Sequence, residues 1–454
     1  MKDEKLSFSA LLAIGVMLFA LFFGAGNLIF PAELGQNAGT NLWPAVFGFL
    51  ITGVGLPLLG IMAMSFSGSA NLQELASRVH PVYAIFFTSL LYLTIGPFFA
   101  APRTGTVAYE VGISSFVSEG NQQAGLLTFT ILFFAIALIF SLKPGRIVDN
   151  VGKILAPGIV ILLVVLLAAV IINPMGAVES PQEAYQSGAF MTGFLEGYNT
   201  MDALASLVFA IIVIGAVRSM GVKSNKGILN ATAKAGIVAI ILLGVIYAGI
   251  AYLGATSTQI FGIAETGGPV LSNAASYYFG TFGSILLAVV ITLACLTTAI
   301  GLIVANAEYF HTLLPKISYK TLVVFFSVLT FVIANFGLAN IITFSVPVLM
   351  FLYPLAIVLM LLTFISPLFN HDRIVYVSTI AVTFFISIFD GLKALTDSLG
   401  IDHFGFMVPF VSFFENTLPM YDQGLGWLMP ALIVIAITGV VSRFRKASAA
   451  TTKA

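Results

Sequence analysis

Twelve apolar stretches, each about as long as a bilayer crossing, follow one another along this chain. They lie near residues 8–34, 42–66, 83–110, 124–142, 154–173, 190–217, 231–254, 276–310, 320–336, 340–365, 374–390 and 426–442. About 20 apolar residues make a transmembrane helix, whereas the strands of a membrane barrel alternate with period two. Only 8% of the residues are charged, against about 25% in soluble domains. The sequence therefore predicts an all-α integral membrane protein with 12 transmembrane helices.

What remains between the stretches is too short for a soluble domain, so residues 1–454 are interpreted as one transmembrane unit. The beginning of the chain imitates a signal peptide, but its apolar run is too long and no small-residue cleavage site ends it. We expect a retained span there. The single cysteine, Cys295, excludes an internal disulfide and a multi-cysteine metal site. A net charge of zero gives no indication of a nucleic-acid partner.

Basic residues are divided unequally between the loops. One set of alternate loops and both termini carry Lys2, Lys5, Arg78, Lys143, Arg146, Lys153, Arg218, Lys223, Lys226, Lys234, Lys316, Lys320, Arg373, Arg443, Arg445, Lys446 and Lys453. The other loops carry only Lys393, and Arg103 falls inside the third span. Basic loops stay in the cytoplasm, and tryptophan favours the membrane interface. Both termini are therefore expected to be cytoplasmic, with Trp43 and Trp427 at the outer interface.

Two of the spans contain residues that disfavour a continuous helix. The first holds Gly24, Ala25, Gly26 and Asn27, and the sixth holds Glu196, Gly197, Tyr198, Asn199, Thr200 and Asp202. Glycine costs a helix about 1 kcal/mol relative to alanine, and a buried amide needs a partner. Aligning Asn27 with Asn199 superposes the two interruptions, as an inverted five-plus-five repeat requires. Paired broken spans mark a transporter site; the alternative is a small-residue helix-packing face.

Ionisable residues inside the spans are few, and each is expensive unless it faces a cavity or a partner. They are Arg103, Glu110, Glu196 and Asp202, with Glu33 and Glu308 nearer the ends of spans. They either follow a substrate or ion path or pair with each other to lock helices together. For Arg103 we favour a structural pair with Glu196 or Glu110. For Glu196, beside a glycine in an interrupted span, we favour the site.

Span eight contains two adjacent hydroxyl residues, Thr297 and Thr298, three and four positions after Ala294. Hard cations prefer oxygen ligands, so this pair is a candidate for a small-cation site. The alternative is that both hydroxyls bond to carbonyls of their own helix. No enzyme constellation accompanies them: the four histidines share no metal-ligand spacing, and no P-loop or nucleophile elbow is present. The chain is not expected to be an enzyme, and no cofactor is expected.

The whole chain resembles the bacterial branched-chain amino acid:cation symporters of the BrnQ type. The matching stretches are Phe22–Pro31, Ala101–Gly105 with Glu110, and Glu196–Asp202. This family belongs to the amino acid–polyamine–organocation group, so the resemblance implies a LeuT-type fold in a bacterial cytoplasmic membrane. Spans 1–5 (8–173) and 6–10 (190–365) would be inverted repeats with broken helices 1 and 6. Spans 11 and 12 (374–442) would lie outside the repeats.

The resemblance also implies where the substrate and the ion bind. In the first span, Gly24, Ala25, Gly26 and Asn27 would receive the substrate, with the Ala25 and Gly26 N–H groups on its carboxylate. In the sixth, Glu196, Gly197, Tyr198, Asn199 and Thr200 would face its ammonium group and side chain. The Na⁺ ligands would be the carbonyls of Ala20, Phe23 and Ala294 and the hydroxyls of Thr297 and Thr298. One departure is Ala20, where neurotransmitter–sodium symporters usually have glycine. Arg103, Glu110 and Asp202 stay candidate coupling or structural charges.

The function expected from these residues and this resemblance is import of leucine, isoleucine and valine coupled to Na⁺. The expected partners are the amino acid, Na⁺ and the lipid bilayer; the sequence does not indicate an oligomeric state. One alternative is a proton-coupled transporter of the same fold, in which Glu196 or Asp202 titrates. An alternative from another class is a channel or a nutrient-sensing membrane receptor, which the two interrupted spans disfavour.

Overall fold

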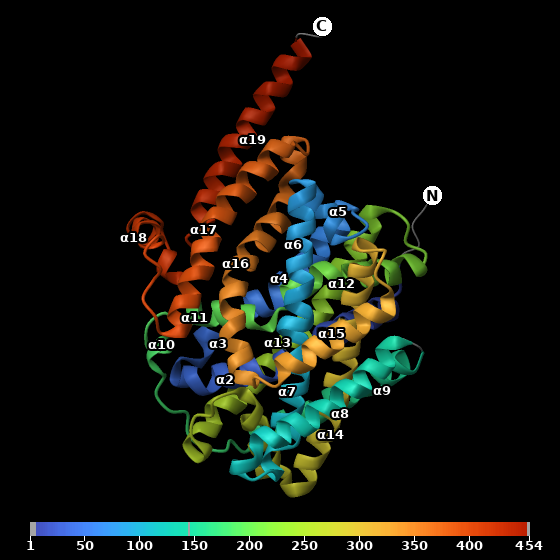
Figure 1. Ribbon diagram of the computed structural model, residues 1–454, viewed down its shortest axis with the longest axis vertical. Helices are drawn as coiled ribbons and strands as arrows, with labels where there is room; N and C mark the ends of the chain where they lie inside the picture. The colour runs from blue at the N-terminus through green and yellow to red at the C-terminus, as the bar shows by residue number, and fades with distance from the viewer. Residues whose placement is uncertain (1–5, 144–145, 452–454) are drawn as a thin grey trace.

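All regular elements in the described residues of the computed structural model, 6–143 and 146–451, are helical, and they form one bundle (Figure 1). Lys2, Lys5 and Lys453 lie outside the described residues, as do the side chains of Arg146, Lys153 and Lys446. The predicted all-α class is confirmed for the described part of the chain.

Helix is present in each of the twelve apolar stretches. The main helices are α1 (Phe8–Phe22), α2 (Ala25–Ala38), α3 (Leu42–Leu50), α4 (Leu56–Ser67), α6 (Pro81–Leu93), α7 (Ala100–Gly112), α8 (Gln122–Leu142), α9 (Arg146–Ile172), α11 (Ala189–Glu196), α12 (Asp202–Ser219), α13 (Asn225–Phe261), α14 (Gly267–Leu313), α15 (Tyr319–Ala334), α16 (Leu338–Ile365), α17 (Arg373–Leu399) and α19 (Leu428–Thr451). Nine helical runs among the described residues are long and apolar enough to cross a membrane by length and composition, and three shorter apolar helices accompany them.

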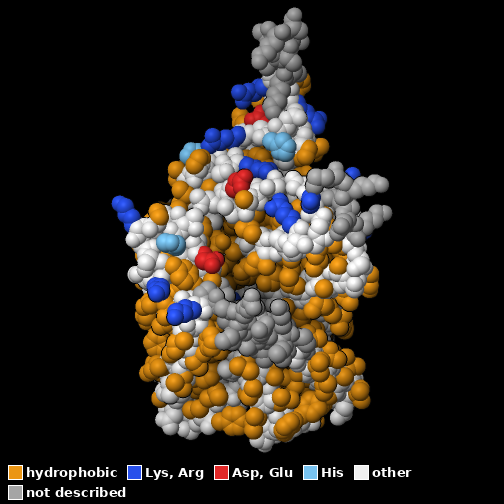
Figure 2. Space-filling view, turned by 90° about the vertical axis from the view of Figure 1, so that its right-hand side faces the viewer, with side chains coloured by type: hydrophobic (Ala, Val, Ile, Leu, Met, Phe, Trp, Pro, Cys, Tyr) orange, Lys and Arg blue, Asp and Glu red, His pale blue; other side chains and the backbone are white. Residues whose placement is uncertain are grey.

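The outer surface of the bundle is apolar. Large hydrophobic side chains such as Phe47, Ile172 and Phe282 are 63%, 83% and 76% exposed. On the face shown in Figure 2, hydrophobic side chains cover the lower part and the charged side chains gather above it. A soluble monomer rarely exposes so much contiguous apolar surface, so this surface fits a protein that lies within lipid.

The first apolar stretch is interrupted between α1 and α2. Gly24 has an extended backbone (φ −118°, ψ −167°), and its N–H donates to Oδ1 of Asn27 at 2.9 Å. In a continuous helix this N–H would instead donate to the carbonyl of Ala20, four residues back. The interruption therefore releases the Ala20 carbonyl from its usual helical partner, while the Asn27 side chain replaces that partner for Gly24.

The sixth apolar stretch is interrupted in a different way. Helix α11 passes into a 3₁₀ segment, η6 (Gly197–Thr200), before α12 begins at Asp202. Between them Met201 has φ +61°, a left-handed conformation that side chains other than glycine rarely adopt. Such a residue costs of order 1–3 kcal/mol and persists only where its surroundings hold it. The change of direction at Met201 is therefore fixed by packing rather than by local preference.

Small residues bring two pairs of helices into close contact. A Cβ built at Gly35 of α2 would lie 1.9 Å from the Ala251 carbonyl oxygen of α13. Conversely, a Cβ at Gly254 of α13 would lie 2.1 Å from the Ala32 carbonyl oxygen of α2. Only glycine allows backbones to approach this closely. The second pair is α11 and α3, where Gly193 lies against Ala45 in the same way.

Two helices differ from the sequence-based boundaries. The stretch near 374–390 continues as α17 to Leu399, and part of the following connection forms α18 (Val408–Thr417). Helix α14 begins at Gly267, before the expected 276–310, and bends at Gly280 (φ +61°). Both extensions are less apolar than the spans they prolong, so hydropathy alone did not include them.

Candidate functional site

The two interruptions lie against each other in the interior of the bundle. A Cβ built at Gly26 of α2 would lie 3.8 Å from Cα of Thr200 in η6. It would also lie 3.2 Å from the ring of Phe30, one turn further along α2. Glycine at position 26 thus keeps the space between α2 and η6 free of a side chain. The first turn of α2, with its unpaired backbone N–H groups, borders this space.

A buried polar cluster connects the same two interruptions with α13. The Nδ2 group of Asn27 donates to Oδ2 of Asp202 and contacts the hydroxyl of Tyr247. The Tyr247 hydroxyl also donates to Oδ2 of Asp202 at 3.3 Å. All three residues are at most 4% exposed. A buried carboxylate without a basic partner costs several kcal/mol unless hydrogen bonds and a proton or cation compensate it.

Arg103 of α7 holds the second interruption from another side. Its Nη1 donates to the carbonyl oxygen of Asn199 at 2.7 Å, and its Nη2 donates to Oγ of Ser345 in α16. The guanidinium also lies over the ring of Phe30, 5.0 Å from the ring centroid. The interaction is therefore a charge-assisted bond to backbone, combined with a cation–π contact.

The expected ion pair of Arg103 with Glu196 or Glu110 is wrong. Within the described residues no salt bridge joins Arg103 to either glutamate. Glu110 accepts a hydrogen bond from Thr266, in front of α14, and Glu196 accepts one from Nδ2 of Asn199 at 2.8 Å. The guanidinium donates instead to the backbone carbonyl of Asn199 in the 3₁₀ segment. A backbone partner of this kind cannot be recognised from the sequence.

The hydroxyls proposed for an ion lie on the other side of the α1–α2 interruption. A Cβ built at Gly24 would lie 3.8 Å from Cγ2 of Thr298. Oγ1 of Thr297 and Oγ1 of Thr298 each donate to the carbonyl oxygen of Ala294, at 2.8 Å and 3.1 Å. Both hydroxyls therefore bond to a carbonyl of their own helix, which is the alternative stated from the sequence, and three oxygens lie on one turn of α14. Each hydroxyl can keep its oxygen in place while its hydrogen rotates.

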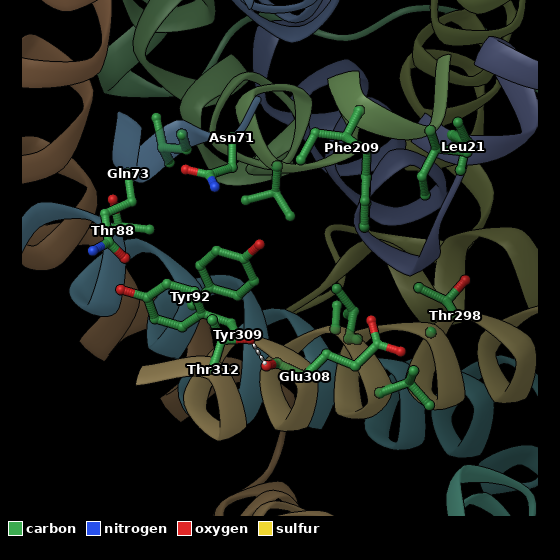
Figure 3. Close-up of a pocket in the computed structure, with 18 of the residues that line it drawn as sticks. Leu21, Asn71, Gln73, Thr88, Tyr92, Phe209, Thr298, Glu308, Tyr309 and Thr312 are labelled. Atoms are coloured by element: carbon green, nitrogen blue, oxygen red, sulfur yellow. Dashed lines mark hydrogen bonds between the residues drawn. The ribbon is translucent and has the colours of Figure 1, made fainter. Parts of the chain in front are cut away.

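A cavity of about 620 Å³ reaches this turn; we call it the Thr298 cavity. Its wall near the interruption includes Ala20 of α1 together with Thr297 and Thr298 of α14. Figure 3 shows Leu21 and Thr298 at one end of this cavity and Thr88, Tyr92 and Tyr309 at the other. The candidate ligand Phe23 is buried at 8% exposure and is not part of this wall.

A second cavity, of about 560 Å³, reaches η6 from α11; we call it the Glu196 cavity. Glu196, Tyr198 and Asn199 line it, together with Asp422 and residues of α11 and α16. The ring of Tyr198 stacks on Tyr353 of α16 with centroids 4.0 Å apart. The two cavities thus approach the paired interruptions from different elements, α11 in one case and α14 in the other.

Gly197 lies next to a third helix rather than next to the space between the interruptions. A Cβ there would be 2.0 Å from Oγ1 of Thr52, in the π-helical segment η2 (Ile51–Gly55) between α3 and α4. That hydroxyl donates to the carbonyl of Phe194 at 2.6 Å. Thr52 therefore supports the end of α11 directly. Glycine at 197 permits this contact.

Sequence reasoning did not identify several residues of this site. Tyr247, Phe30, Ser345 and Thr52 all contact residues that it did identify. Tyr247 had a usable signal, because a tyrosine in the middle of an apolar span needs a partner for its hydroxyl. The other three had none, since serine and threonine in such spans usually bond to their own helix and phenylalanine is ordinary packing.

Comparison with known proteins identifies relatives over almost the whole chain. The family model described as "Branched-chain amino acid transport protein" matches residues 7–445. The branched-chain amino acid permease BrnQ of Bacillus subtilis is 49% identical over 444 residues, 98% of this chain and 99% of the relative. A branched-chain amino acid transport system 2 carrier protein of Pseudomonas aeruginosa is 43% identical over 433 residues, 95% of this chain and 96% of the relative.

Solved structures share the fold at low sequence identity. One described as the inward facing conformation of Mhp1 gives a TM-score of 0.58 at 15% identity, covering 92% of this chain and 94% of that chain. A manganese transporter of Eremococcus coleocola also gives 0.58, at 13% identity, covering 98% and 97%. The predicted LeuT-type fold is confirmed at the level of overall fold by the likeness to Mhp1.

Proposed function

Because the chain belongs to the branched-chain amino acid transport protein family, a family of membrane transport proteins and not of enzymes, we propose that it imports leucine, isoleucine and valine with Na⁺ by alternating access. One observation carries the coupling part of this proposal. The α1–α2 interruption lies beside Thr200 of η6 at Gly26 and beside the methyl group of Thr298 in α14 at Gly24. A substrate and an ion bound at these two contacts would share one short segment of backbone.

The amino acid would bind between α2 and η6. The N–H groups of Ala25 and Gly26 in the first turn of α2 would receive its carboxylate, aided by the helix dipole. Its ammonium group would face η6, on the side of Glu196 and Asn199. Asn27 is engaged with Gly24 and Asp202, so its part is to hold the interruption in shape.

Na⁺ would bind on the opposite side of the same interruption. The carbonyls of Ala20 and Phe23 would supply two ligands from α1, and Ala294, Thr297 and Thr298 would supply three oxygens from α14. The missing helical partner of the Ala20 carbonyl supports the set. The hydroxyls of Thr297 and Thr298 donate to the carbonyl of Ala294, and their oxygens keep lone pairs that an ion could use. Oxygen donors are the ligands that a hard cation prefers.

The packing of the interrupted helices supports twelve crossings with a five-plus-five inverted repeat. Helices α1 and α2 both pack on α13, in the seventh stretch. Helices α11 and α12 pack on α3 and α4, in the second stretch. Span one thus packs on span seven, and span six packs on span two. Each broken span contacts the second span of the other repeat, as two intertwined inverted repeats would produce.

The charge distribution supports a cytoplasmic mouth for the Thr298 cavity. Asn71 and Gln73 line it a few positions before Arg78 in the sequence, and Thr312 lines it four positions before Lys316. These residues thus adjoin the basic loops, which stay in the cytoplasm. The Glu196 cavity would then open outward, the termini would be cytoplasmic, and the described arrangement would give the ion site access to the cytoplasm.

Uptake of labelled leucine into proteoliposomes under a sodium gradient alone, and then under a proton gradient alone, tests the proposal. We expect accumulation in the first case and none in the second. Accumulation driven by protons without sodium would contradict the sodium assignment. Counterflow of labelled leucine against unlabelled isoleucine should saturate, and a non-saturable flux would indicate a channel.

A proton-coupled transporter of the same fold is the second candidate. The observation that favours it is Asp202, a buried carboxylate that accepts hydrogen bonds from Asn27 and Tyr247 rather than from a basic side chain in the described chain. Such a group is suited to carry a proton through the cycle. The same two-gradient experiment distinguishes the two candidates.

A further inference from the structure

One face of α14 forms a continuous wall of the Thr298 cavity. Residues at helical spacing line it, from the candidate ion ligands at one end to the last turns of the helix at the other: Thr297, Thr298, Gly301, Ala305, Glu308 and Thr312. Glu308 follows Thr298 by ten positions, which corresponds to about 15 Å along the helix axis. The two positions are therefore separate places along one path rather than parts of one coordination sphere.

Glu308 is the only charged residue among the described residues that line this cavity. Figure 3 shows its carboxylate directed into the cavity between Thr298 and the Tyr92–Tyr309 pair. Neither a hydrogen bond nor a salt bridge to another side chain engages this carboxylate in the described part of the chain. Glu308 is exposed, so solvent or a cation can reach its carboxylate.

The surroundings of Glu308 provide further oxygen atoms. Thr88 lines the same cavity at the end near Tyr92; its side chain is buried at 1% exposure, and its hydroxyl has no hydrogen-bond partner in the described chain. The rings of Tyr92 and Tyr309 stack with centroids 4.2 Å apart. A negative charge at the mouth of a cavity raises the local concentration of cations, and hydroxyl oxygens suit a partly hydrated hard cation.

We propose that Glu308 is a second, transient cation site on the cytoplasmic side, where Na⁺ pauses between the Thr297–Thr298 turn and the cytoplasm. This inference rests on the proposed sodium coupling. At 15 Å, one unit charge changes the occupancy of the ion site by about two- to sixfold, for an effective dielectric constant between that of water and about 20. Sodium that enters or leaves on the cytoplasmic side would also pass Glu308, whereas sodium from outside would not, so the larger effect is expected on the affinity seen from the cytoplasm.

The test compares sodium activation from the two faces of the membrane. The half-saturating sodium concentration is measured for labelled leucine transport in right-side-out and inside-out membrane vesicles that carry the full chain. Glu308→Gln should raise the cytoplasmic value about two- to sixfold, with a larger shift at low ionic strength because screening is weaker. Glu308→Asp should stay near the wild-type value. Thr88→Val should shift it in the same direction by less, and it serves as the second variant if Glu308→Gln does not reach the membrane.

Glu119→Gln is the matched control, because Glu119 is an exposed acid in η5 (Glu119–Asn121) and lines neither cavity. It should leave the cytoplasmic value unchanged, and a shift like that of Glu308→Gln would overturn the inference as a general charge effect. Unchanged cytoplasmic activation in Glu308→Gln, or an equal shift on both faces, would overturn it while the proposed function stands. A wild-type protein without sodium dependence on either face would overturn the proposed function and this inference together.

Discussion

The guanidinium of Arg103 donates a 2.7 Å hydrogen bond to the backbone carbonyl of Asn199, so a charged side chain of α7 fixes the irregular turn before α12. The second donor nitrogen reaches Ser345 of α16. The fork geometry of the guanidinium allows both contacts at once, which a lysine ammonium at the same place cannot reproduce. The conformation of η6 therefore depends on one side chain from outside its own span.

Replacing Arg103 by lysine should lower the initial rate of leucine uptake roughly 10- to 100-fold, because a hydrogen bond to a charged group is worth about 1.5–3 kcal/mol. The rate is normalised to the amount of protein in the membrane. Ser345→Ala removes only the second contact and should have a smaller effect. Wild-type uptake by Arg103→Lys would show that the bond to Asn199 is dispensable.

The double substitution Thr297→Ala with Thr298→Ala should raise the half-saturating sodium concentration more than tenfold, since two of the proposed oxygen ligands are lost. Leucine uptake is measured as a function of external sodium. Thr292→Ala, on the same helix but away from the cavity wall, is the matched control and should behave as wild type. Sodium dependence that is unchanged in the double variant would remove this ion site from the mechanism.

Asp202→Asn should retain sodium-driven uptake within about threefold, because an asparagine oxygen can accept the bonds from Asn27 and Tyr247 that Oδ2 accepts now. Uptake is compared under the separate sodium and proton gradients. Loss of all gradient-driven uptake, with counterflow retained, would instead indicate that the charge of Asp202 takes part in coupling.

Gly26→Leu should abolish leucine uptake, because its side chain would occupy the space between Phe30 and Thr200. Gly120→Leu is the control, since a Cβ at Gly120 meets nothing within 4 Å. Binding of labelled leucine to purified protein separates a filled site from an impaired cycle. Full transport by a well-expressed Gly26→Leu variant would rule out the proposed substrate position.

Gly35→Ala should destabilise the protein by about 1–3 kcal/mol, the usual cost of overpacking, because its Cβ would lie 1.9 Å from the Ala251 carbonyl oxygen. The expected result is a lower unfolding temperature in detergent. Gly439→Ala, in the open surroundings of α19, should leave that temperature unchanged. Equal unfolding temperatures for the two variants would mean that α2 and α13 can move apart without loss of stability.

Sequence alone could predict the interruptions because their residues are chemically unsuited to a continuous helix in lipid. Gly24, Gly26 and Asn199 stood out for that reason: Gly24 is extended, Gly26 lies in the first turn of α2 just after it, and Asn199 lies in the 3₁₀ segment η6. The adjacent hydroxyls of Thr297 and Thr298 also stood out; in the structure both bond to the carbonyl of Ala294 in their own helix, and the ion site stays a prediction. These features could be recognised because each depends only on residues close together in the sequence.

Partners across the bundle could not be predicted in the same way. The acceptor for Arg103 is a backbone carbonyl, which every residue has, so the sequence suggested glutamates instead. The contact of Gly197 with Thr52 depends on a π-helical turn at Ile51–Gly55, whose residues read as an ordinary apolar span. The lengths of α14 and α17 depend on contacts of less apolar segments that hydropathy does not detect.

The hydrogen bonds of Asn27 bear on how tightly ion flux is coupled to substrate flux in such a transporter. One amide spans Gly24, which lies beside Thr298, and Asp202, whose N–H is bonded to Thr200. An ion at the hydroxyl turn and an amino acid against η6 would therefore act on the two ends of a single chain of contacts. Uncoupled leakage, in which the ion crosses without substrate, would require these buried hydrogen bonds to break. Leakage should accordingly be rare, and variants of Asn27 should be the ones that show it.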